Sequence, residues 1–187
     1  MGQKNNIYIR EFVTDDAESL LELNLANRTI FEAITPVSND DSFYILDAHL
    51  KLIEGWKQAK KLGSRYDFGI FESGNNKLIG MIALYKFGAS EKCVLGYSLD
   101  KGHNGKGYAT EAVRLILEIA FKELGFHRVE AGVMPRNIGS ARVLEKSGLD
   151  IINMVDFNKS FMRMSTEDFV INLIKHYKVK GLVVGFN

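Results

Sequence analysis

The fold is best predicted from the segment Leu95–Leu149, which reads LGYSLDKGHNGKGYATEAVRLILEIAFKELGFHRVEAGVMPRNIGSARVLEKSGL. It opens with a strand-like run that leads into a glycine-rich loop, after which apolar residues recur at helical spacing over Tyr108–Leu124. The residues Arg128–Val133 then predict a strand, and a shorter helix begins at Asn137 or Ser140. A strand, a helix and a second strand in this succession predict a parallel crossover.

The loop Asn104–Thr110, with the sequence NGKGYAT, has the composition of an anion-binding turn. Its glycines let the backbone turn tightly and bring N–H groups close to a bound anion. The helix that follows adds unpaired N–H groups and the positive end of its dipole. Together these features predict a pyrophosphate site, although a plain strand-to-helix turn also uses glycines and remains the alternative.

The rest of the chain extends this pattern in both directions. Before the segment we expect a strand at Asn6–Phe12 and a first helix after Thr14. A second helix is expected to begin within Asn39–Ser42 and to end at Gly63. Three strands then form an antiparallel meander, at Tyr66–Glu72, Lys77–Phe87 and Lys92–Leu99. The expected buried stripe of the second helix is Ile45, Ala48, Leu52, Trp56 and Ala59. After the segment, strands are expected near 149–155 and 169–174. The fold class is therefore α+β with a mixed sheet, residues 1–175 forming one domain and 176–187 a tail of unassigned role.

Composition excludes several classes of function. The 187 residues carry a net charge of +1, so no global field favours nucleic acid or an anionic membrane as a partner. No apolar run approaches the roughly 20 residues of a membrane span. The single cysteine, Cys93, cannot pair within the chain, which is typical of a cytoplasmic protein. The four histidines show no metal-ligand spacing, and we therefore expect no metal.

The segment Leu95–Leu149 resembles the GNAT acetyltransferases and, within them, the RimJ/RimL-like branch of ribosomal-protein acetyltransferases. The superfamily pattern is Gln or Arg, any two residues, Gly, any residue, then Gly or Ala, and it falls here on Asn104–Ala109. Asn104 replaces the usual Gln or Arg, while the glycines are retained. The stretches HRVEAGVMPRN and SARVLEKSGL also look like this branch. The resemblance implies a mixed-sheet α/β fold with a central, mostly antiparallel sheet that is splayed in the middle and flanked by helices.

The same resemblance implies acetyl-CoA as cosubstrate. The strand end Tyr97–Leu99 would pair with the pantetheine arm, and an N–H left free by the splay would polarise the thioester carbonyl. The loop amides would bind the pyrophosphate, and the next helix would lie along the pantetheine. The implied cofactor-binding residues are Tyr97, Ser98, Leu99, Asn104, Gly105, Lys106, Gly107, Tyr108, Ala109, Thr110, Asn137 and Ser140. Arg142 and Lys146 would either meet the nucleotide phosphates or form a solvated helix face.

Two residues are candidates for catalysis. Many relatives carry a Tyr that protonates the leaving thiolate, but Leu144 stands at that position here. Ser140, one turn earlier on the same helix face, is the nearest hydroxyl, and its alternative role is an N-terminal cap. Glu130 is the candidate general base because it lies within an apolar strand, and its alternative role is an ion pair with Arg10, Arg128 or Lys92.

The resemblance also places acceptor-side residues in the first helices, where Arg28 and Phe31 are the substrate-binding candidates. We expect transfer of an acetyl group to a primary amine, such as a peptide N-terminal α-amine or a small amine, by direct attack with general-base assistance. Two other functions stay open at this point: an NAD(P)-binding oxidoreductase, since Gly105–Thr110 approximates a dinucleotide fingerprint, and a non-catalytic acyl-CoA-binding module. A homodimer is also open.

Overall fold

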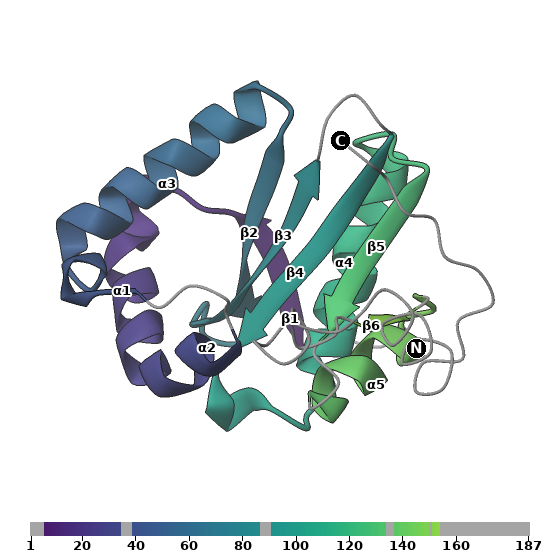
Figure 1. Cartoon of the computed structure of the whole chain (residues 1–187). Coiled ribbons are helices and arrows are strands. Elements are labelled where there is room, and N and C mark those ends of the chain that lie inside the picture. The colour runs from purple at the N-terminus through teal and green to yellow at the C-terminus, as the bar shows by residue number, and fades with distance from the viewer. Residues whose placement is uncertain (1–5, 35–38, 87–90, 134–136, 150, 154–187) are drawn as a thin grey trace, which may run out of the picture.

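One sheet organises the part of the chain that the structure, a computed structural model, describes: residues 6–34, 39–86, 91–133, 137–149 and 151–153. Its strands follow the chain in the order β1-β2-β3-β4-β5-β6 (Figure 1). Neighbouring strands are antiparallel from β1 to β4, whereas β4–β5 and β5–β6 are parallel. The strands are β1 (Ile7–Glu11), β2 (Arg65–Glu72), β3 (Leu78–Lys86), β4 (Lys92–Leu99), β5 (Arg128–Val133) and β6 (Ile151–Asn153).

Helices cover both faces of this sheet, with α4 behind it and α1 and α3 beside it in the view of Figure 1. The helices are α1 (Ala17–Ala26), α2 (Arg28–Ile34), α3 (Leu46–Lys61), α4 (Tyr108–Lys122) and α5 (Ile138–Lys146). Short 3-10 turns are η1 (Thr14–Asp16), η2 (Asp41–Phe43) and η3 (Lys101–His103). Each face buries its own apolar cluster: α4 and α5 pack with Ile82, Leu95 and Val113, and α1 and α3 pack with Leu20, Ile53 and Phe71. Because the sheet is held from both sides, its strand ends are fixed supports for a site.

The sheet opens between β4 and β5. The two strands pair only from Lys92↔Arg128 to Leu95↔Ala131, and beyond this point they diverge (Figure 1). On its other side β4 stays paired with β3 as far as Gly80↔Leu99. The stretch Gly96–Leu99 therefore has one edge held by β3 and the other without a described strand partner. This confirms the predicted fold, a mostly antiparallel sheet splayed in its middle and flanked by helices.

Two details differ from the sequence expectation, and a third expected element is not described. Helix α2 was not expected, because its seven residues are too few to show an apolar period. The buried side chains of α3 are His49, Ile53 and Trp56, whereas the expected stripe began at Ile45, which is half exposed. The strand expected near 169–174 lies outside the described residues. No described helix is long and apolar enough to cross a membrane.

The buried ring of His49 explains why the α3 stripe was misplaced. Its Nδ1 lies 3.0 Å from the carbonyl oxygen of Ile45, which can only accept a hydrogen bond, so Nδ1 donates. Nε2 then accepts from the Asn24 amide at 3.0 Å. Both ring nitrogens are thus satisfied inside the α1–α3 interface, and a residue that hydropathy ranks as polar occupies the centre of the face.

Candidate active site

A cavity of about 540 Å³ lies where the sheet opens, at the end of β4. Its volume is within the range of small-molecule sites. Three separate stretches of the chain supply its walls, namely α2, the stretch from the end of β4 through the loop into α4, and α5. The lining residues are Ile30, Phe31, Tyr97, Ser98, Leu99, His103, Asn104, Gly105, Gly107, Tyr108, Ala109, Thr110, Asn137, Gly139, Ser140, Arg142, Val143 and Lys146. Of the cofactor-binding residues expected from the sequence, all except Lys106 are therefore in one cavity wall.

The loop before α4 has the geometry of an anion cradle. Gly105 and Gly107 have φ angles of 77° and 84°, in the left-handed region that favours glycine. Gly107 is also the N-cap of α4, and it offers no side chain to the first N–H groups of the helix. No heavy atom lies within 4 Å of where a Cβ would stand at either glycine. The positive end of a 15-residue helix thus faces the cavity with donors that no capping side chain occupies.

Tyr97 and Ser140 meet across the opening. The Tyr97 hydroxyl lies 2.9 Å from Ser140 Oγ, which joins the end of β4 to the first turn of α5. Asn137 is the N-cap of α5, and its Oδ1 accepts from the Ser140 amide at 3.1 Å. The capping role that was the alternative for Ser140 therefore belongs to Asn137. Burial raises the pKa of the Tyr97 phenol, and the hydrogen bond with Ser140 opposes that shift.

Glu130 lies on β5 in the paired half of the sheet, opposite Val94, and does not line the cavity. Its Oε1 accepts from Arg128 Nε at 2.8 Å and lies 3.9 Å from Lys92 Nζ. The structure thus places Glu130 in the ion pair that was its alternative role. Leu144 is 1% exposed and belongs to the apolar cluster under α4 and α5, so it adds no polar group to the cavity.

Of the two acceptor-side candidates, only one lines the cavity. Phe31 is buried and lines the cavity from α2, beside Ile30. Arg28 does not line it, because its guanidinium pairs with Glu32 at 3.1 Å and Asp41 at 2.9 Å, and stacks over the Tyr44 ring. Arg28 therefore links α2 to η2, whereas Phe31 faces the site.

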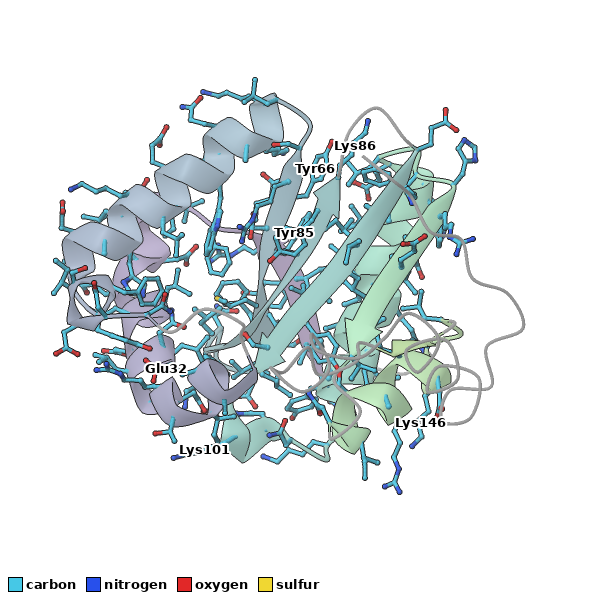
Figure 2. All side chains as sticks on the ribbon, in the orientation of Figure 1. Glu32, Tyr66, Tyr85, Lys86, Lys101 and Lys146 are labelled. Carbon is cyan, nitrogen blue, oxygen red and sulfur yellow. The ribbon has the colours of Figure 1, made fainter. Side chains whose placement is uncertain are left out.

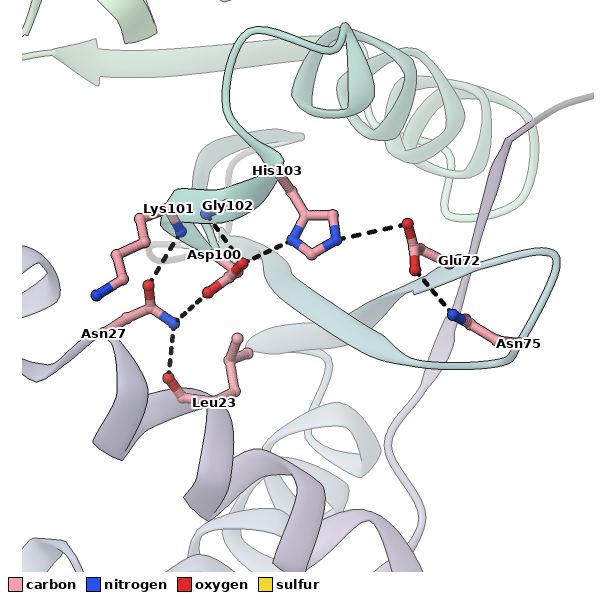
Figure 3. A network of polar contacts seen from close by, with 8 residues as sticks. All are labelled: Leu23, Asn27, Glu72, Asn75, Asp100, Lys101, Gly102 and His103. Atoms are coloured by element: carbon pink, nitrogen blue, oxygen red, sulfur yellow. Dashed lines mark hydrogen bonds and ion pairs between the residues drawn. The ribbon is translucent and has the colours of Figure 1, made fainter.

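A polar network connects the cavity to the first helices (Figure 3). Asp100 accepts from the Asn27 amide at 2.8 Å and from the Gly102 N–H at 3.0 Å. Its Oδ2 lies 2.6 Å from His103 Nδ1, and His103 Nε2 faces Glu72 Oε1 at 3.4 Å. Burial raises the pKa of Asp100, but these hydrogen bonds outweigh burial and hold the pKa below its ordinary value. The network fixes η3 and hence the start of the glycine loop.

Sequence reasoning did not identify Asn27 as the hub of this network. Asn27 is 2% exposed, and its Oδ1 accepts from the Lys101 amide while its Nδ2 donates to the Leu23 carbonyl and to Asp100. The available signal was its place at the C-cap of α1, directly before α2. Nothing in the sequence showed that a residue 73 positions later would be its partner.

Basic residues gather near the mouth of the cavity. Arg142 and Lys146 line it from α5, and Figure 2 shows Lys146 at the lower end of the molecule. Among the residues of the described ranges, no group of three or more His, Cys, Asp or Glu is placed to hold a metal ion. The site is thus an open strand edge, an uncapped helix N-terminus, a pair of hydroxyls and nearby positive charge.

Comparisons with known proteins agree with this geometry. A family model described as an acetyltransferase (GNAT) domain matches residues 6–150. YjcK of Bacillus subtilis, named as a probable N-acetyltransferase, is 46% identical over 150 residues, covering 79% of this chain and 82% of that protein. The [ribosomal protein uS5]-alanine N-acetyltransferase of Escherichia coli is 28% identical over 139 residues, covering 72% of this chain and 70% of that protein.

Solved structures share the fold. The ribosomal-protein-S5-alanine acetyltransferase of Vibrio fischeri superposes with a TM-score of 0.71 at 24% identity, over 78% of this chain and 80% of that one. Mycobacterium smegmatis RimJ in complex with CoA-disulfide gives a TM-score of 0.69 at 24% identity, over 74% and 68%. A second family model, FAD synthetase, matches residues 127–187, which is less than half of the chain and mostly beyond the described residues.

Proposed function

The chain belongs to the GNAT family of acetyltransferases and is an acetyl-CoA-dependent N-acetyltransferase, and from this premise we propose that its acceptor is a protein or peptide N-terminal α-amine. The alternatives of an oxidoreductase and of a non-catalytic binding module are set aside by this membership and by the enzymes among its relatives.

The residues present fit acetyl-CoA. In this proposal the free edge of Gly96–Leu99 pairs with the pantetheine arm as an added strand would. The loop amides at Gly105–Thr110 and the uncapped start of α4 take the diphosphate. Arg142 and Lys146, which line the same cavity, meet the remaining phosphate charge. The 540 Å³ cavity joins these parts without a break, so a single extended ligand can reach all of them.

The reaction sets three tasks for the protein. The acceptor ammonium has to lose a proton before it attacks the thioester carbonyl directly. A backbone N–H on the unpaired edge of β4 stabilises the oxyanion that forms. A hydroxyl protonates the departing thiolate, and Ser140 is placed for this because its side chain lines the cavity while Asn137 caps the helix. The contacts of Glu130 with Arg128 and Lys92 do not support a role as base, so the proposal keeps general-base assistance without assigning its residue.

The charge of the cavity wall favours a peptide α-amine over a polyamine. Among the described lining residues none is acidic, and the acceptor side is formed by Ile30, Phe31 and Leu99. A polycation needs carboxylates to replace its water, because an unpaired ammonium is costly to desolvate. A peptide α-amine brings one charge and a side chain that an apolar wall can contact. The E. coli relative, which by name acetylates an alanine of ribosomal protein uS5, supports the same choice.

An acceptor screen tests this proposal. The purified chain is given acetyl-CoA with short peptides that carry a free α-amine, with the same peptides blocked at the α-amine but containing lysine, and with spermidine. We expect kcat/KM to be at least about tenfold higher for a free α-amine, a difference of about 1.4 kcal/mol. Equal or better turnover with spermidine or with the blocked peptides would overturn the choice of acceptor, although not the enzyme class.

A further inference from the structure

The contact between Tyr97 and Ser140 has a role that neither residue would have alone. Tyr97 comes from the unpaired end of β4 and Ser140 from the first turn of α5, so their 2.9 Å hydrogen bond spans the two walls of the opening. Both residues line the cavity. The bond therefore lies at the place where, under the proposed function, the pantetheine arm passes between β4 and α5.

Strand alternation explains why the phenol reaches this position. Leu95 and Leu99 are buried in the cluster beneath α4, and Tyr97, midway between them on β4, packs against the same cluster. The ring is thus held by apolar contacts while its hydroxyl extends to α5. Ser140 is equally fixed, because its backbone N–H is bound by the cap residue Asn137. Tyrosine and serine have few rotatable side-chain bonds, so the contact costs little conformational entropy to maintain.

The two hydroxyls differ in acidity, and the leaving group needs a proton from one of them. When the tetrahedral adduct collapses, the carbon–sulfur bond breaks and its electron pair goes to sulfur, which then needs a proton. An isolated serine hydroxyl is a much weaker acid than a phenol, whose ordinary pKa is about 10. At its ordinary pKa the phenol already carries its proton at neutral pH and can pass it along the 2.9 Å contact with Ser140, while burial raises that pKa further. Tyr108, the other tyrosine of the lining, stacks on His103 at the loop end of the cavity, away from this contact.

We propose that Tyr97 is the proton source for the departing thiolate and that Ser140 passes this proton on. Ser140 Oγ gives its proton to the sulfur and takes the proton of the Tyr97 hydroxyl in the same step, which leaves CoA as a thiol and Tyr97 as a phenolate. The phenolate regains a proton from solvent water. The acceptor starts as an ammonium and gives up two protons, one before it attacks and one when the adduct becomes an amide. CoA leaves with one proton on its thiol, so the overall reaction releases one proton. This inference rests on the proposed direct transfer and not on the identity of the acceptor.

The pair explains how the chain functions with Leu144 buried in the core. A phenol supplied by β4 and relayed by α5 reaches the cavity from the opposite wall, and no hydroxyl is then needed at position 144. The substitution Leu144→Tyr would add a hydroxyl under the helix, where the side chain is 1% exposed and closely packed.

Single-turnover kinetics on Tyr97→Phe, Ser140→Ala, Ser140→Thr and the Tyr97→Phe/Ser140→Ala double variant test the relay. The best acceptor of the screen is used, so a failure of the α-amine proposal does not affect the result. We expect Tyr97→Phe and Ser140→Ala each to slow acetyl transfer about 10- to 100-fold, the scale of one acid–base group. The double variant should be no slower than either single variant, and Ser140→Thr, which keeps the hydroxyl, should recover most of the rate. Acetyl-CoA affinity by calorimetry should stay within about twofold, because neither hydroxyl is needed to hold the cofactor.

Tyr66→Phe is the matched control, since Tyr66 is a half-buried tyrosine of β2 whose ring packs edge-on against Phe126, outside the cavity. It should keep the parent rate. If Tyr97→Phe transfers at the parent rate while Ser140→Ala is slow, Ser140 acts alone and the relay is wrong. If the two losses multiply in the double variant, the residues act independently and the relay is also wrong. A Tyr97→Phe variant that only melts earlier or binds acetyl-CoA less tightly assigns Tyr97 a structural role and overturns the proposal.

Discussion

At the scale of single residues, the site depends on backbone positions as much as on side chains. Gly107 ends the loop in a left-handed conformation and begins α4 without a cap, which leaves the helix N–H groups for a ligand. Ser140 likewise keeps its hydroxyl for the contact with Tyr97, because Asn137 takes the capping role. In both cases the residue at the helix start determines which donors remain available to the cavity.

Gly107→Val should abolish measurable acetyl-CoA binding while the protein still folds. A β-branched residue at a φ of 84° is strained, and its side chain would fill the space that the diphosphate needs. Gly125→Val is the matched control, because Gly125 has a φ of 68° at the far end of α4, outside the cavity. Both variants should lose similar stability in urea unfolding, and only Gly107→Val should lose affinity in calorimetry. Unchanged affinity in Gly107→Val would remove the loop from the site.

The variant Glu130→Gln distinguishes an ion-pair role of Glu130 from a role as general base. Since Glu130 pairs with the exposed Arg128 and Lys92 and lies outside the cavity, we expect a loss of unfolding free energy below about 1 kcal/mol. The curve of turnover against pH should keep the shape of the parent's curve, and the rates should at most be lower by the same factor at every pH. A rate loss that is large at acid pH and shrinks as free amine becomes abundant at high pH would instead establish Glu130 as the general base.

At the scale of elements, the cofactor loop and the acceptor-side helices form one connected unit. Asn27 ends α1, precedes α2 and holds both the Lys101 amide and the Asp100 carboxylate of the turn before the loop. Phe31, one turn further along α2, lines the cavity. A shift of η3 would therefore be transmitted to the wall that the acceptor meets.

Asn27→Ala should destabilise the fold by about 2–3 kcal/mol at pH 7, because it removes hydrogen bonds to a carboxylate and to a buried amide. The native pKa of Asp100 lies below its ordinary value, so the ionised carboxylate stabilises the fold above the unfolded-state pKa of about 3.9. That contribution is lost as pH falls through the native pKa. The difference between parent and variant in urea unfolding should thus narrow from pH 7 to about pH 3.

The Asp100→Asn background provides the control for this pH dependence. Without the titrating carboxyl, Asn27→Ala should cost the same at both pH values. A difference between parent and Asn27→Ala that stays constant with pH in the native background would show that Asn27 does not act through Asp100.

The elements also show what the sequence could and could not predict. The meander, the α4 helix and the β5 strand were predicted because their periods and glycine boundaries are local signals. Helix α2 was missed because its seven residues carry no period, and the face of α3 was misplaced because His49 is buried through partners on α1. The Tyr97–Ser140 and Asn27–Asp100 contacts join residues 43 and 73 positions apart, and only the folded sheet brings them together.

At the scale of the whole molecule, the opening of the sheet is the feature that makes a site. Two apolar clusters hold the sheet from both faces, so β4 can lose β5 as a partner beyond Leu95 without collapsing. Buried N–H and C=O groups on such an edge need another partner. The edge, the glycine loop and α5 all line one cavity, and we propose that acetyl-CoA supplies this partner.

Amide hydrogen exchange with and without acetyl-CoA locates the N–H groups that the cofactor binds. Saturating acetyl-CoA should slow exchange in 96–99 on β4 and in 105–110 at the start of α4, because those N–H groups acquire partners. Exchange in β1 and β2, which are remote from the cavity, should change little. Protection that leaves 96–99 and 105–110 unchanged while it appears elsewhere in the chain would contradict the claim that acetyl-CoA binds in the opening between β4 and β5.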